Sequence, residues 1–387
     1  MTDREKPVVA HTVIPWLPRS GSWIHAQVAR LERWRAIALT KRIENREVFP
    51  FEPVYSVSEL PAAARLAERL GKKRRGYYPL WRRKIEEHGA RLIHSHFGNW
   101  GWEDLPLKRA LGLAQVSSFY GADVWKLGMR EDWRERYRDY FAGGDRFLVE
   151  GNAMRRRVIE LGCPPEKVLV HHLGVDLARI AFQPRRPGPD GVVRFLAAGR
   201  MVGTKGHDLA VRAFARVHRR NPRTRLGMIL IPPERRAEQA LEPVRAAIAE
   251  ERVADAVTLH GYMPYPEYLA ALASYHVFLQ PSRHLPDGDA EGGAPVAMIE
   301  MSASGLPVVG SIHCDIPEVI LDGVSGLLFP EDDVEAMAEA MLRLASESER
   351  WPDMGAAGRA HVEREYNAAL QAPRLERIYD TLSPGNV

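Results

Sequence analysis

Residues 290–307, AEGGAPVAMIEMSASGLP, predict a tight turn followed by a short helix. Glu291 stands before the turn and Glu300 stands within the helix. Gly292 and Gly293 form the turn, and residues without a side chain let the backbone approach a ligand closely. We therefore expect a ligand site where the turn meets the helix, with a carboxylate on either side of it.

The helix in this segment is predicted from spacing and from its end signals. Val296, Ile299 and Ala303 recur at helical intervals, Pro295 suits the first helical position, and Gly305 ends the run. The unpaired N–H groups of a helix start favour an anion, and a diphosphate is the commonest biological candidate. An ordinary loop–helix–strand connection with solvated glutamates would show the same pattern, so spacing alone leaves both interpretations open.

The segment resembles the glutamate-pair signature of retaining glycosyltransferase family 4, and residues 304–329, SGLPVVGSIHCDIPEVILDGVSGLLF, are similar to the family's continuation. The resemblance implies that Glu291 contacts the donor sugar and that Glu300 holds the ribose hydroxyls of the nucleotide. It also implies that the intervening residues line the donor site, namely Gly292, Gly293, Ala294, Pro295 and Val296. The family usually has seven residues between the two carboxylates. This chain has eight, and the glycine pair can absorb the extra one.

Residues 193–208, VRFLAAGRMVGTKGHD, predict a strand, a glycine-rich turn and the start of a helix. Its glycines fit neither the P-loop nor the dinucleotide-binding spacing. Arg200 and Lys205 do suit phosphate chemistry, because cations flanking a turn can neutralise a leaving diphosphate without a metal. Surface cations beside a turn are common, but this segment is similar to the family's Gly-Arg…Lys-Gly phosphate clamp. The resemblance thus implies catalytic roles for Arg200 and Lys205 alongside Glu291.

The whole chain has 387 residues, enough for two ordinary cores. Cys163 and Cys314 are its two cysteines, too few for a disulfide framework or a cysteine zinc site, so a reducing cytoplasm is the simplest compartment. The opening MTDREKPVV is charged and then only briefly apolar, and no apolar run reaches membrane-spanning length. We expect a cytoplasmic protein of two domains.

Charge is divided unevenly along the chain. Residues 1–180 carry 32 Lys and Arg against 22 Asp and Glu, whereas residues 181–387 carry 22 against 28. Residues 71–84, GKKRRGYYPLWRRK, combine cations with Tyr77, Tyr78 and Trp81, which suits an anionic membrane surface or a phosphate-bearing acceptor. A solvated helix face would have the same composition. Because no recognition motif accompanies the charge, nucleic acid is not an expected partner.

The first half shows motifs at the ends of predicted strands. Residues 20–24, SGSWI, stand where the resembled family has the first loop bordering its cleft, which implies that Gly21 lies near the donor, although a plain turn glycine fits equally. In residues 91–101, RLIHSHFGNWG, alternation places His94 and His96 on one face of a strand. No third ligand follows at telling spacing, so we expect no metal. Many family members carry His-x-His-Phe-Gly here, on the acceptor side, which implies the same for His96 and the adjacent Phe97 and Asn99.

A tyrosine replaces a family histidine in the next loop. Relatives often have Phe-His-Gly where this chain has Phe119-Tyr120-Gly121. Tyr120 can hydrogen-bond a sugar hydroxyl or stack on a ring, but a phenol is a poor base at neutral pH. We assign Tyr120 and the following Asp123 to the acceptor side.

The second half continues as alternating strands and helices, which predicts a parallel sheet with ligand-binding loops at the carboxyl ends of its strands. Tyr262 and Met263 lie in such a loop, GYMPYPEY, and are expected to border the nucleobase. Residues 287–289, DGD, match a metal motif of another glycosyltransferase fold, but we interpret them as a loop that leads to Glu291. Pro373 is expected to break the final amphipathic stretch into two helical pieces.

Together these observations predict an α/β protein of GT-B architecture, with two Rossmann-like domains facing a central cleft. We expect an acceptor-side domain at 1–182, a Pro/Gly-rich linker at 183–191, a nucleotide-sugar domain at 192–365 and a terminal helical segment at 366–387 that returns to the first domain. The expected activity is retaining, metal-independent transfer of a sugar from a nucleotide-diphosphate donor to a hydroxyl on a glycan, glycolipid or small molecule in polysaccharide biosynthesis, without a cofactor. A nucleotide-sugar epimerase of the same fold and a non-catalytic sugar- or membrane-binding protein are the alternatives.

Overall fold

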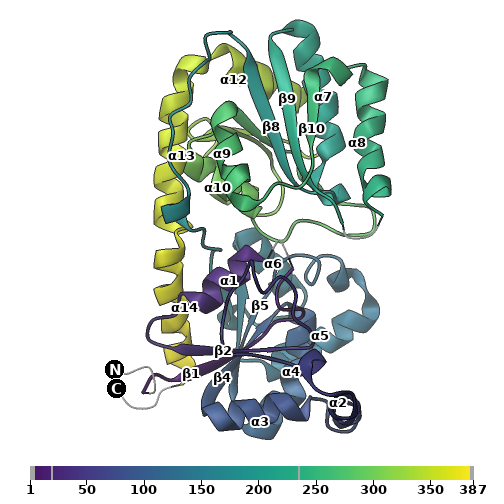
Figure 1. The fold of residues 1–387 in the computed structure, drawn as a ribbon, viewed down its shortest axis with the longest axis vertical. Helices are drawn as coiled ribbons and strands as arrows, with labels where there is room; N and C mark the ends of the chain where they lie inside the picture. The colour runs from purple at the N-terminus through teal and green to yellow at the C-terminus, as the bar shows by residue number, and fades with distance from the viewer. Residues whose placement is uncertain (1–4, 19–20, 234–235, 384–387) are drawn as a thin grey trace. The chain divides into compact units, whose positions relative to one another are not determined.

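The computed structural model describes residues 5–18, 21–233 and 236–383. The chain forms two compact units (Figure 1): unit 1 comprises Met1–Asp176 with Asn367–Val387, and unit 2 comprises Leu177–Tyr366. Each unit is a parallel sheet with helices on its faces. In the described part of the chain, every helix is too short or too polar to cross a bilayer.

Unit 1 contains a seven-stranded sheet in the order β3-β2-β1-β4-β5-β6-β7, and all its pairs are parallel. Its strands are β1 (Val8–Thr12), β2 (Arg35–Thr40), β3 (Val54–Ser56), β4 (Ala90–His96), β5 (Ala114–Ser118), β6 (Arg146–Val149) and β7 (Val168–Val170). Its helices are α1 (Ser22–Ala29), α2 (Ala62–Arg75), α3 (Pro79–His88), α4 (Gly98–Leu111), α5 (Glu131–Gly143), α6 (Asn152–Glu160) and α14 (Ala368–Leu382). Short 3-10 turns are η1 (Val57–Glu59), η2 (Leu127–Met129) and η3 (Pro165–Lys167).

Alternate residues of these strands enter two different cores, because successive side chains of a strand point to opposite faces. On one face Val9 of β1 packs in a cluster with Ile24 of α1 and Leu375 of α14. On the other face Val8 of β1 joins a cluster with Trp81 of α3. Both faces of the sheet are therefore covered, which explains the nearly continuous apolar runs of its strands.

Unit 2 contains a six-stranded parallel sheet in the order β10-β9-β8-β11-β12-β13. Its strands are β8 (Val193–Arg200), β9 (Thr224–Ile231), β10 (Val257–His260), β11 (Val277–Gln280), β12 (Val308–Ser311) and β13 (Gly326–Phe329). Its helices are α7 (His207–Arg220), α8 (Ala237–Glu251), α9 (Tyr265–Ala271), α10 (Val296–Ser304), α11 (Ile316–Val319), α12 (Val334–Ser346) and α13 (Trp351–Glu365). The 3-10 turns are η4 (Leu177–Arg179), η5 (Gly203–Lys205), η6 (Ala254–Ala256), η7 (Leu272–Ser274) and η8 (Ser348–Arg350).

The strand order of each unit reverses beside its first strand, β1 or β8. In unit 2 the chain first builds outward through β9 and β10, and then returns to the other side of β8 with β11, β12 and β13. Loops leave opposite sides of such a reversal and open a crevice at the carboxyl ends of the strands. Arg200 ends β8, and Lys205, Glu291 and Glu300 follow β8 or β11, so these predicted residues lie at the reversal of unit 2.

Residues 183–191 belong to unit 2 in the structure, although their composition predicts a linker. The Gln183 amide donates to the Ser304 carbonyl at 3.0 Å, and the buried Arg185 side chain donates to both the carbonyl and the hydroxyl of Ser304. These bonds satisfy carbonyls at the end of α10, where a helix leaves acceptors unpaired. The Pro-rich stretch is thus fastened to α10, and the division between the units falls at Asp176 and Leu177.

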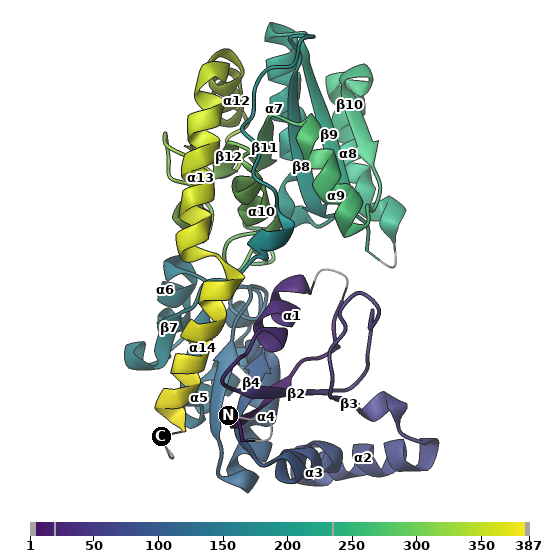
Figure 2. The same cartoon turned by 60° about the vertical axis from the view of Figure 1, so that its left-hand side comes forward.

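The break in the C-terminal helical region falls at Tyr366 and Asn367, not at Pro373 as the sequence predicted. The Asn367 side chain accepts from the Ala369 amide at 3.0 Å and caps α14. Pro373 lies inside α14 near its start, so it costs that helix a hydrogen bond without dividing it. Figure 2 shows α14 running beside α1 in unit 1.

Glu376 of α14 anchors this helix to unit 1. One of its carboxylate oxygens accepts from the backbone amides of Glu32, Arg33 and Trp34, at 2.8, 2.6 and 3.0 Å. These amides precede β2, and the Glu376 side chain is buried. The buried carboxylate therefore satisfies three consecutive backbone donors just before β2, of which that of Trp34 belongs to a buried residue.

We predict that Glu376→Ala lowers the free energy of unfolding by about 3 kcal/mol, because three backbone N–H groups lose a charged acceptor in a buried place. Urea unfolding of the purified chain measures this loss. The matched control is Glu363→Ala on α13, where the side chain is 51% exposed and pairs with Arg359, so the midpoint should hardly move. Equal midpoints for the two variants would contradict the anchoring role.

Candidate active site

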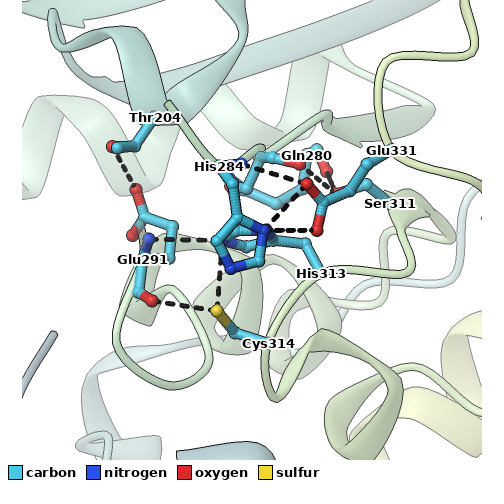
Figure 3. Close-up of polar contacts among 9 residues, drawn as sticks. Thr204, Gln280, His284, Glu291, Ser311, His313, Cys314 and Glu331 are labelled. Atoms are coloured by element: carbon cyan, nitrogen blue, oxygen red, sulfur yellow. Dashed lines mark hydrogen bonds and ion pairs between the residues drawn. The ribbon is translucent and has the colours of Figure 1, made fainter. Parts of the chain in front are cut away.

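Three loops of unit 2 meet at the carboxyl ends of β8, β11 and β12 (Figure 3). The loop after β8 carries Thr204 and Lys205, and the long loop after β11 carries Glu291. The loop after β12 carries His313 and Cys314. Because β8, β11 and β12 are neighbours in the sheet, residues separated by more than a hundred positions come together around Glu291.

Both oxygens of the Glu291 carboxylate are bound. Lys205 Nζ lies 2.7 Å from Oε2, and the Thr204 hydroxyl donates to Oε1 at 3.0 Å. The side chains of Lys205 and Glu291 are only 9% and 10% exposed. Burial works to raise the pKa of Glu291, but Lys205, Arg200 and Thr204 outweigh it and lower the pKa below its ordinary value. The site therefore holds a buried carboxylate and a buried ammonium group in contact.

The loop after β8 approaches the loop after β11 closely at Gly206. This glycine has a φ of +61°, and a Cβ there would lie 1.9 Å from the Pro281 carbonyl oxygen. No side chain fits, so a glycine must follow Lys205. Arg200 is exposed at the end of β8, and its backbone carbonyl contacts Nε2 of the buried His207 at 3.1 Å. Burial lowers the pKa of His207 to about 4, so that ring is neutral.

His313 and Cys314 hold the backbone of Glu291 from both sides of the residue. The Glu291 amide donates to His313 Nε2 at 3.2 Å, and the Cys314 thiol donates to the Glu291 carbonyl at 3.0 Å (Figure 3). His313 is fully buried and Cys314 is half-buried. We call this pair the backbone clamp; it fixes the first carboxylate although one extra residue separates it from Glu300.

Glu331 orients two histidine rings behind the backbone clamp. It contacts Nδ1 of His313 at 2.7 Å and Nδ1 of His284 at 3.0 Å. Burial opposes ionisation of Glu331, but hydrogen bonds from His284 and His313 outweigh it and hold its pKa well below the usual range. A carboxylate at Nδ1 assigns the proton of each neutral ring to that nitrogen, so Nε2 of His313 can accept from Glu291.

Glu300 occupies the second position of the carboxylate pair, inside α10. It is buried, and Tyr265 donates its hydroxyl to Oε1 at 2.8 Å. Arg179 lies over the Tyr265 ring, 4.6 Å from its centroid. Burial raises the pKa of Glu300 to about 7, against the opposing effect of Tyr265 and Arg179. This carboxyl group therefore changes its charge near neutral pH.

The other predicted donor residues of unit 2 fall in two places. Gly292, Gly293, Ala294 and Pro295 are buried between Glu291 and α10, and Val296 is the first helical residue. Pro295 is the N-cap of α10 and not its first helical residue, whereas Gly305 ends the helix with a φ of +93° as expected. Tyr262 is exposed and Met263 half-buried in the loop between β10 and α9. That loop also leads to Tyr265, which sequence reasoning did not single out.

Residues 287–289 form a turn before Glu291. The Asp289 amide donates to the Asp287 carboxylate at 3.1 Å, and the Asp289 carbonyl accepts from the Leu285 amide at 2.8 Å. Gly288 has a φ of +81°, which suits a turn. The segment has the geometry of a loop that leads to Glu291.

Among the predicted acceptor-side residues of unit 1, His96 and Tyr120 are in direct contact. The Tyr120 hydroxyl lies 2.6 Å from His96 Nδ1, and His96 Nε2 lies 3.0 Å from His11 Nδ1. Burial raises the pKa of Tyr120 well above its ordinary value and lowers the pKa of His96. Both groups are therefore neutral hydrogen-bonding groups at neutral pH.

His11 is a third imidazole that the spacing of the sequence did not reveal. The register of β1 and β4 sets His11 opposite His94, and ligand atoms of His11, His94 and His96 lie within 4.8 Å of one another. His94 contacts Tyr379 through Nδ1 at 2.6 Å and Ser118 through Nε2 at 2.8 Å. Because both nitrogens of His94 are bonded within the protein, the cluster is a neutral hydrogen-bonded core.

The other predicted residues of unit 1 shape loops. Asp123 is buried, and its carboxylate accepts from the amides of Gly98, Tyr120 and Gly121 at 2.7 to 3.1 Å, so it ties two loops together. Phe97 has a φ of +71° where β4 turns into α4, and Asn99 lies in the first turn of α4.

Gly21 stands directly before α1. A Cβ there would lie 3.0 Å from the Pro18 carbonyl oxygen, a tight contact, so a glycine suits this turn. The preceding residue of the SGSWI motif, Ser20, lies outside the described residues.

Comparison with known proteins agrees with this geometry. Residues 193–347 match the family model described as Glycosyl transferases group 1, and residues 41–179 match Glycosyltransferase Family 4. The amylovoran biosynthesis glycosyltransferase AmsK of Erwinia amylovora is 32% identical over 296 residues, which cover 76% of this chain and 71% of AmsK. The chain belongs to glycosyltransferase family 4 and is a glycosyltransferase.

Solved structures share the fold at low sequence identity. Sucrose-phosphate synthase of Thermosynechococcus elongatus has a TM-score of 0.79 at 17% identity, covering 97% of this chain and 99% of that one. HepE of Anabaena, in complex with UDP and glucose, has a TM-score of 0.76 at 13% identity, covering 97% and 100%. These matches support the GT-B architecture, two Rossmann-like α/β domains.

The raised pKa of Glu300 predicts a pH-dependent stability. Above the ordinary pKa of 4.5 the unfolded chain releases this proton, whereas the folded chain keeps it up to about pH 7. The folded state therefore binds more protons in that window. The contribution of Glu300 to the free energy of unfolding is complete below pH 4.5 and is lost as the pH rises towards 7.

We predict that the free energy of unfolding of Glu300→Gln, which cannot ionise, rises relative to that of the wild type by about 3 kcal/mol between pH 4.5 and pH 8. This value follows from about 1.36 kcal/mol per unit of pKa difference. Urea unfolding at both pH values measures the change, and Glu363→Gln at an exposed site is the control. A difference between Glu300→Gln and wild type that stays constant with pH would contradict the assignment.

Proposed function

We propose that this glycosyltransferase moves a sugar from a nucleotide-diphosphate donor to a hydroxyl acceptor with retention of configuration and without a bound metal. The contact between Lys205 and Glu291, beside the exposed Arg200, is the observation that carries the proposal. It sets a cation and a carboxylate side by side at the carboxyl ends of β8 and β11, where parallel sheets bind ligands.

Lys205 and Arg200 supply the charge that a leaving diphosphate requires. Negative charge develops on the diphosphate as the glycosidic bond breaks, and preorganised cations stabilise it without further reorganisation. The start of α10, beside the two glycines, adds unpaired backbone N–H groups. The acceptor hydroxyl attacks the face that the diphosphate leaves, and a phosphate oxygen takes its proton. Glu291 orients the donor sugar and keeps Lys205 in place.

Glu300 is suited to the nucleotide end of the donor. When ionised, its carboxylate accepts hydrogen bonds from vicinal ribose hydroxyls, and Tyr265 keeps it oriented at 2.8 Å. Tyr262 and Met263, in the loop that precedes Tyr265 of α9, are suited to contact a nucleobase. HepE is in complex with UDP and glucose, which supports a nucleotide-sugar donor for a chain of this fold.

We propose that the acceptor is a hydroxyl-bearing substrate of polysaccharide biosynthesis, because AmsK is named for the biosynthesis of amylovoran. In unit 1 the Tyr120 hydroxyl, held by His96, can bond an acceptor hydroxyl; the Phe97 ring packs edge-on against the Tyr120 ring, and Asn99 follows in the first turn of α4. The high pKa of Tyr120 makes it a positioning group and not the base. This suits a mechanism in which the donor phosphate receives the proton.

We predict that Lys205→Ala lowers turnover of the nucleotide sugar by about two orders of magnitude, because the leaving group loses a cation. Lys205→Met keeps the side-chain volume and should behave alike if circular dichroism shows both variants folded.

NMR of the wild-type product should show the anomeric configuration of the donor, and excess EDTA should leave the rate unchanged. The control Arg219→Ala removes an exposed pair with Glu251 and should keep the wild-type rate. An inverted product, or activity that EDTA abolishes and Mn²⁺ restores, would overturn the proposal.

The basic segment 71–84 contributes to a membrane-docking surface, but its aromatic residues do not. The aromatic residues Trp81 and Tyr77 of this segment are buried against the sheet of unit 1, so these rings do not reach a bilayer surface. Apolar contact comes instead from α2, where Leu66 and Leu70 are 58% and 55% exposed one turn apart. The same helix exposes a group of cations, Arg65, Arg69, Lys73, Arg74 and Arg75. We propose that α2 docks on an anionic bilayer.

Docking through α2 predicts salt-sensitive binding to vesicles that contain phosphatidylserine. Replacing Lys73, Arg74 and Arg75 with Ser should weaken the affinity for these vesicles, measured by co-sedimentation, by roughly 100-fold, at about 1 kcal/mol for each cation. Lys72 is left in place because it pairs with Glu103 at 3.1 Å inside the protein. The control replaces three exposed arginines of unit 2 with Ser: Arg219, Arg220 and Arg223. Equal partitioning of the two variants, or binding that salt does not weaken, would favour a soluble acceptor.

A further inference from the structure

The backbone clamp of Glu291 forms, together with His284, a cluster of side chains that could hold a metal ion. His284 follows β11, and His313 and Cys314 follow β12. One ligand atom of each lies within 4.8 Å of the others, and Cys314 Sγ is already 3.3 Å from His313 Nε2. Around a tetrahedral Zn²⁺, with bonds of about 2.3 Å to sulfur and about 2.0 Å to nitrogen, neighbouring ligand atoms lie roughly 3.3 to 3.6 Å apart. A side-chain shift of about 1 Å therefore closes the cluster around an ion.

The histidines already have the tautomer that a metal needs. Glu331 contacts Nδ1 of both His284 and His313, so Nε2 of each ring carries the lone pair. A carboxylate bonded to the outer nitrogen of a ligand histidine is the usual support of zinc sites, because it fixes the ring and makes the ligand nitrogen more basic. Figure 3 shows both rings on the same side of the Glu331 carboxylate, with Cys314 beyond them.

The backbone at Cys314 is strained. Cys314 has a φ of +44°, in the left-handed region that residues with a side chain rarely adopt. The side chain is half-buried and faces the Glu291 carbonyl. The His284 side chain is 43% exposed, so an ion can reach the cluster from solvent.

We propose that His284, His313 and Cys314 bind Zn²⁺ and that the bound ion inhibits glycosyl transfer. The Cys314 thiol releases its proton to water as the Zn–S bond forms, and nothing is oxidised or reduced. The thiolate and the Glu331 carboxylate together balance the two positive charges. A sulfur and nitrogen ligand set of this kind favours zinc over magnesium or calcium.

Inhibition follows from the contacts that the ion replaces, and this step rests on the proposed function. His313 Nε2 accepts from the Glu291 amide, and the Cys314 thiol donates to the Glu291 carbonyl. Coordination takes both atoms, so the backbone on either side of Glu291 loses its partner. Glu291 then leaves the position in which it holds Lys205 and the donor sugar.

The binding step is tested on the full chain after dialysis against EDTA, with Co²⁺ as a spectroscopic substitute for Zn²⁺. One equivalent should give the near-ultraviolet thiolate-to-cobalt band and tetrahedral visible bands, and Zn²⁺ should displace it. Cys314→Ser should abolish the thiolate band. Cys163→Ser should keep it, because Cys163 is buried in unit 1 and burial raises its pKa to about 12. Glu331→Gln should weaken Zn²⁺ binding by about 10- to 100-fold.

The inhibition step is tested by turnover of the nucleotide sugar with and without stoichiometric Zn²⁺. Zn²⁺ should lower the rate of the wild type and EDTA should restore it. The rate of Cys314→Ser, whatever its value without metal, should be the same with and without Zn²⁺. A wild type without the thiolate band, a band that persists in Cys314→Ser, or full activity with zinc bound would each overturn the inference. A wild type that shows the band but transfers no sugar from any donor would instead refute the proposed function, because the spectroscopic test uses no substrate.

Discussion

The buried ion pair between Lys205 and Glu291 is the interaction on which the candidate active site of this enzyme depends. Two charges withdrawn from water are stable only if their remaining hydrogen-bonding capacity is used. The Thr204 hydroxyl donates to the second carboxylate oxygen of Glu291, and the backbone clamp of His313 and Cys314 fixes the main chain of Glu291. The pair is therefore held rigidly before any substrate arrives, which is how an active site can stabilise charge without reorganisation.

The arrangement of the ion pair follows from strand order. Lys205 and Glu291 are 86 positions apart, and the clamp lies 22 positions beyond Glu291. They meet because β8, β11 and β12 are adjacent and parallel, so their carboxyl ends share one edge. Gly206 then lets the first loop approach the second, where any side chain would collide with the Pro281 carbonyl. One glycine thus decides whether the cation reaches the carboxylate.

The two units handle buried polar groups in different ways. Around Glu291 in unit 2 the buried Lys205 and Glu291 are paired, and the pKa of Glu291 and that of Glu331 are both lowered. In unit 1 the histidines of β1 and β4 are neutral and bond to one another and to tyrosines. The difference suits the division of work that we propose: charge stabilises a leaving diphosphate, whereas neutral donors and acceptors position a hydroxyl.

The family resemblance singled out Glu291, Glu300 and Lys205, whereas local patterns in the sequence determined the two parallel sheets and the helix α10 with its glycine end. These features depend on hydrophobic period, turn residues and spacing, all of which lie within a few residues of one another. The tertiary structure alone decided which distant side chains meet. It brought His313, Cys314 and Glu331 to Glu291 and His11 to His96, because strand order and register set those contacts. It also buried Trp81 and exposed Leu66, since packing against a sheet, and not composition, decides which face of a helix meets water.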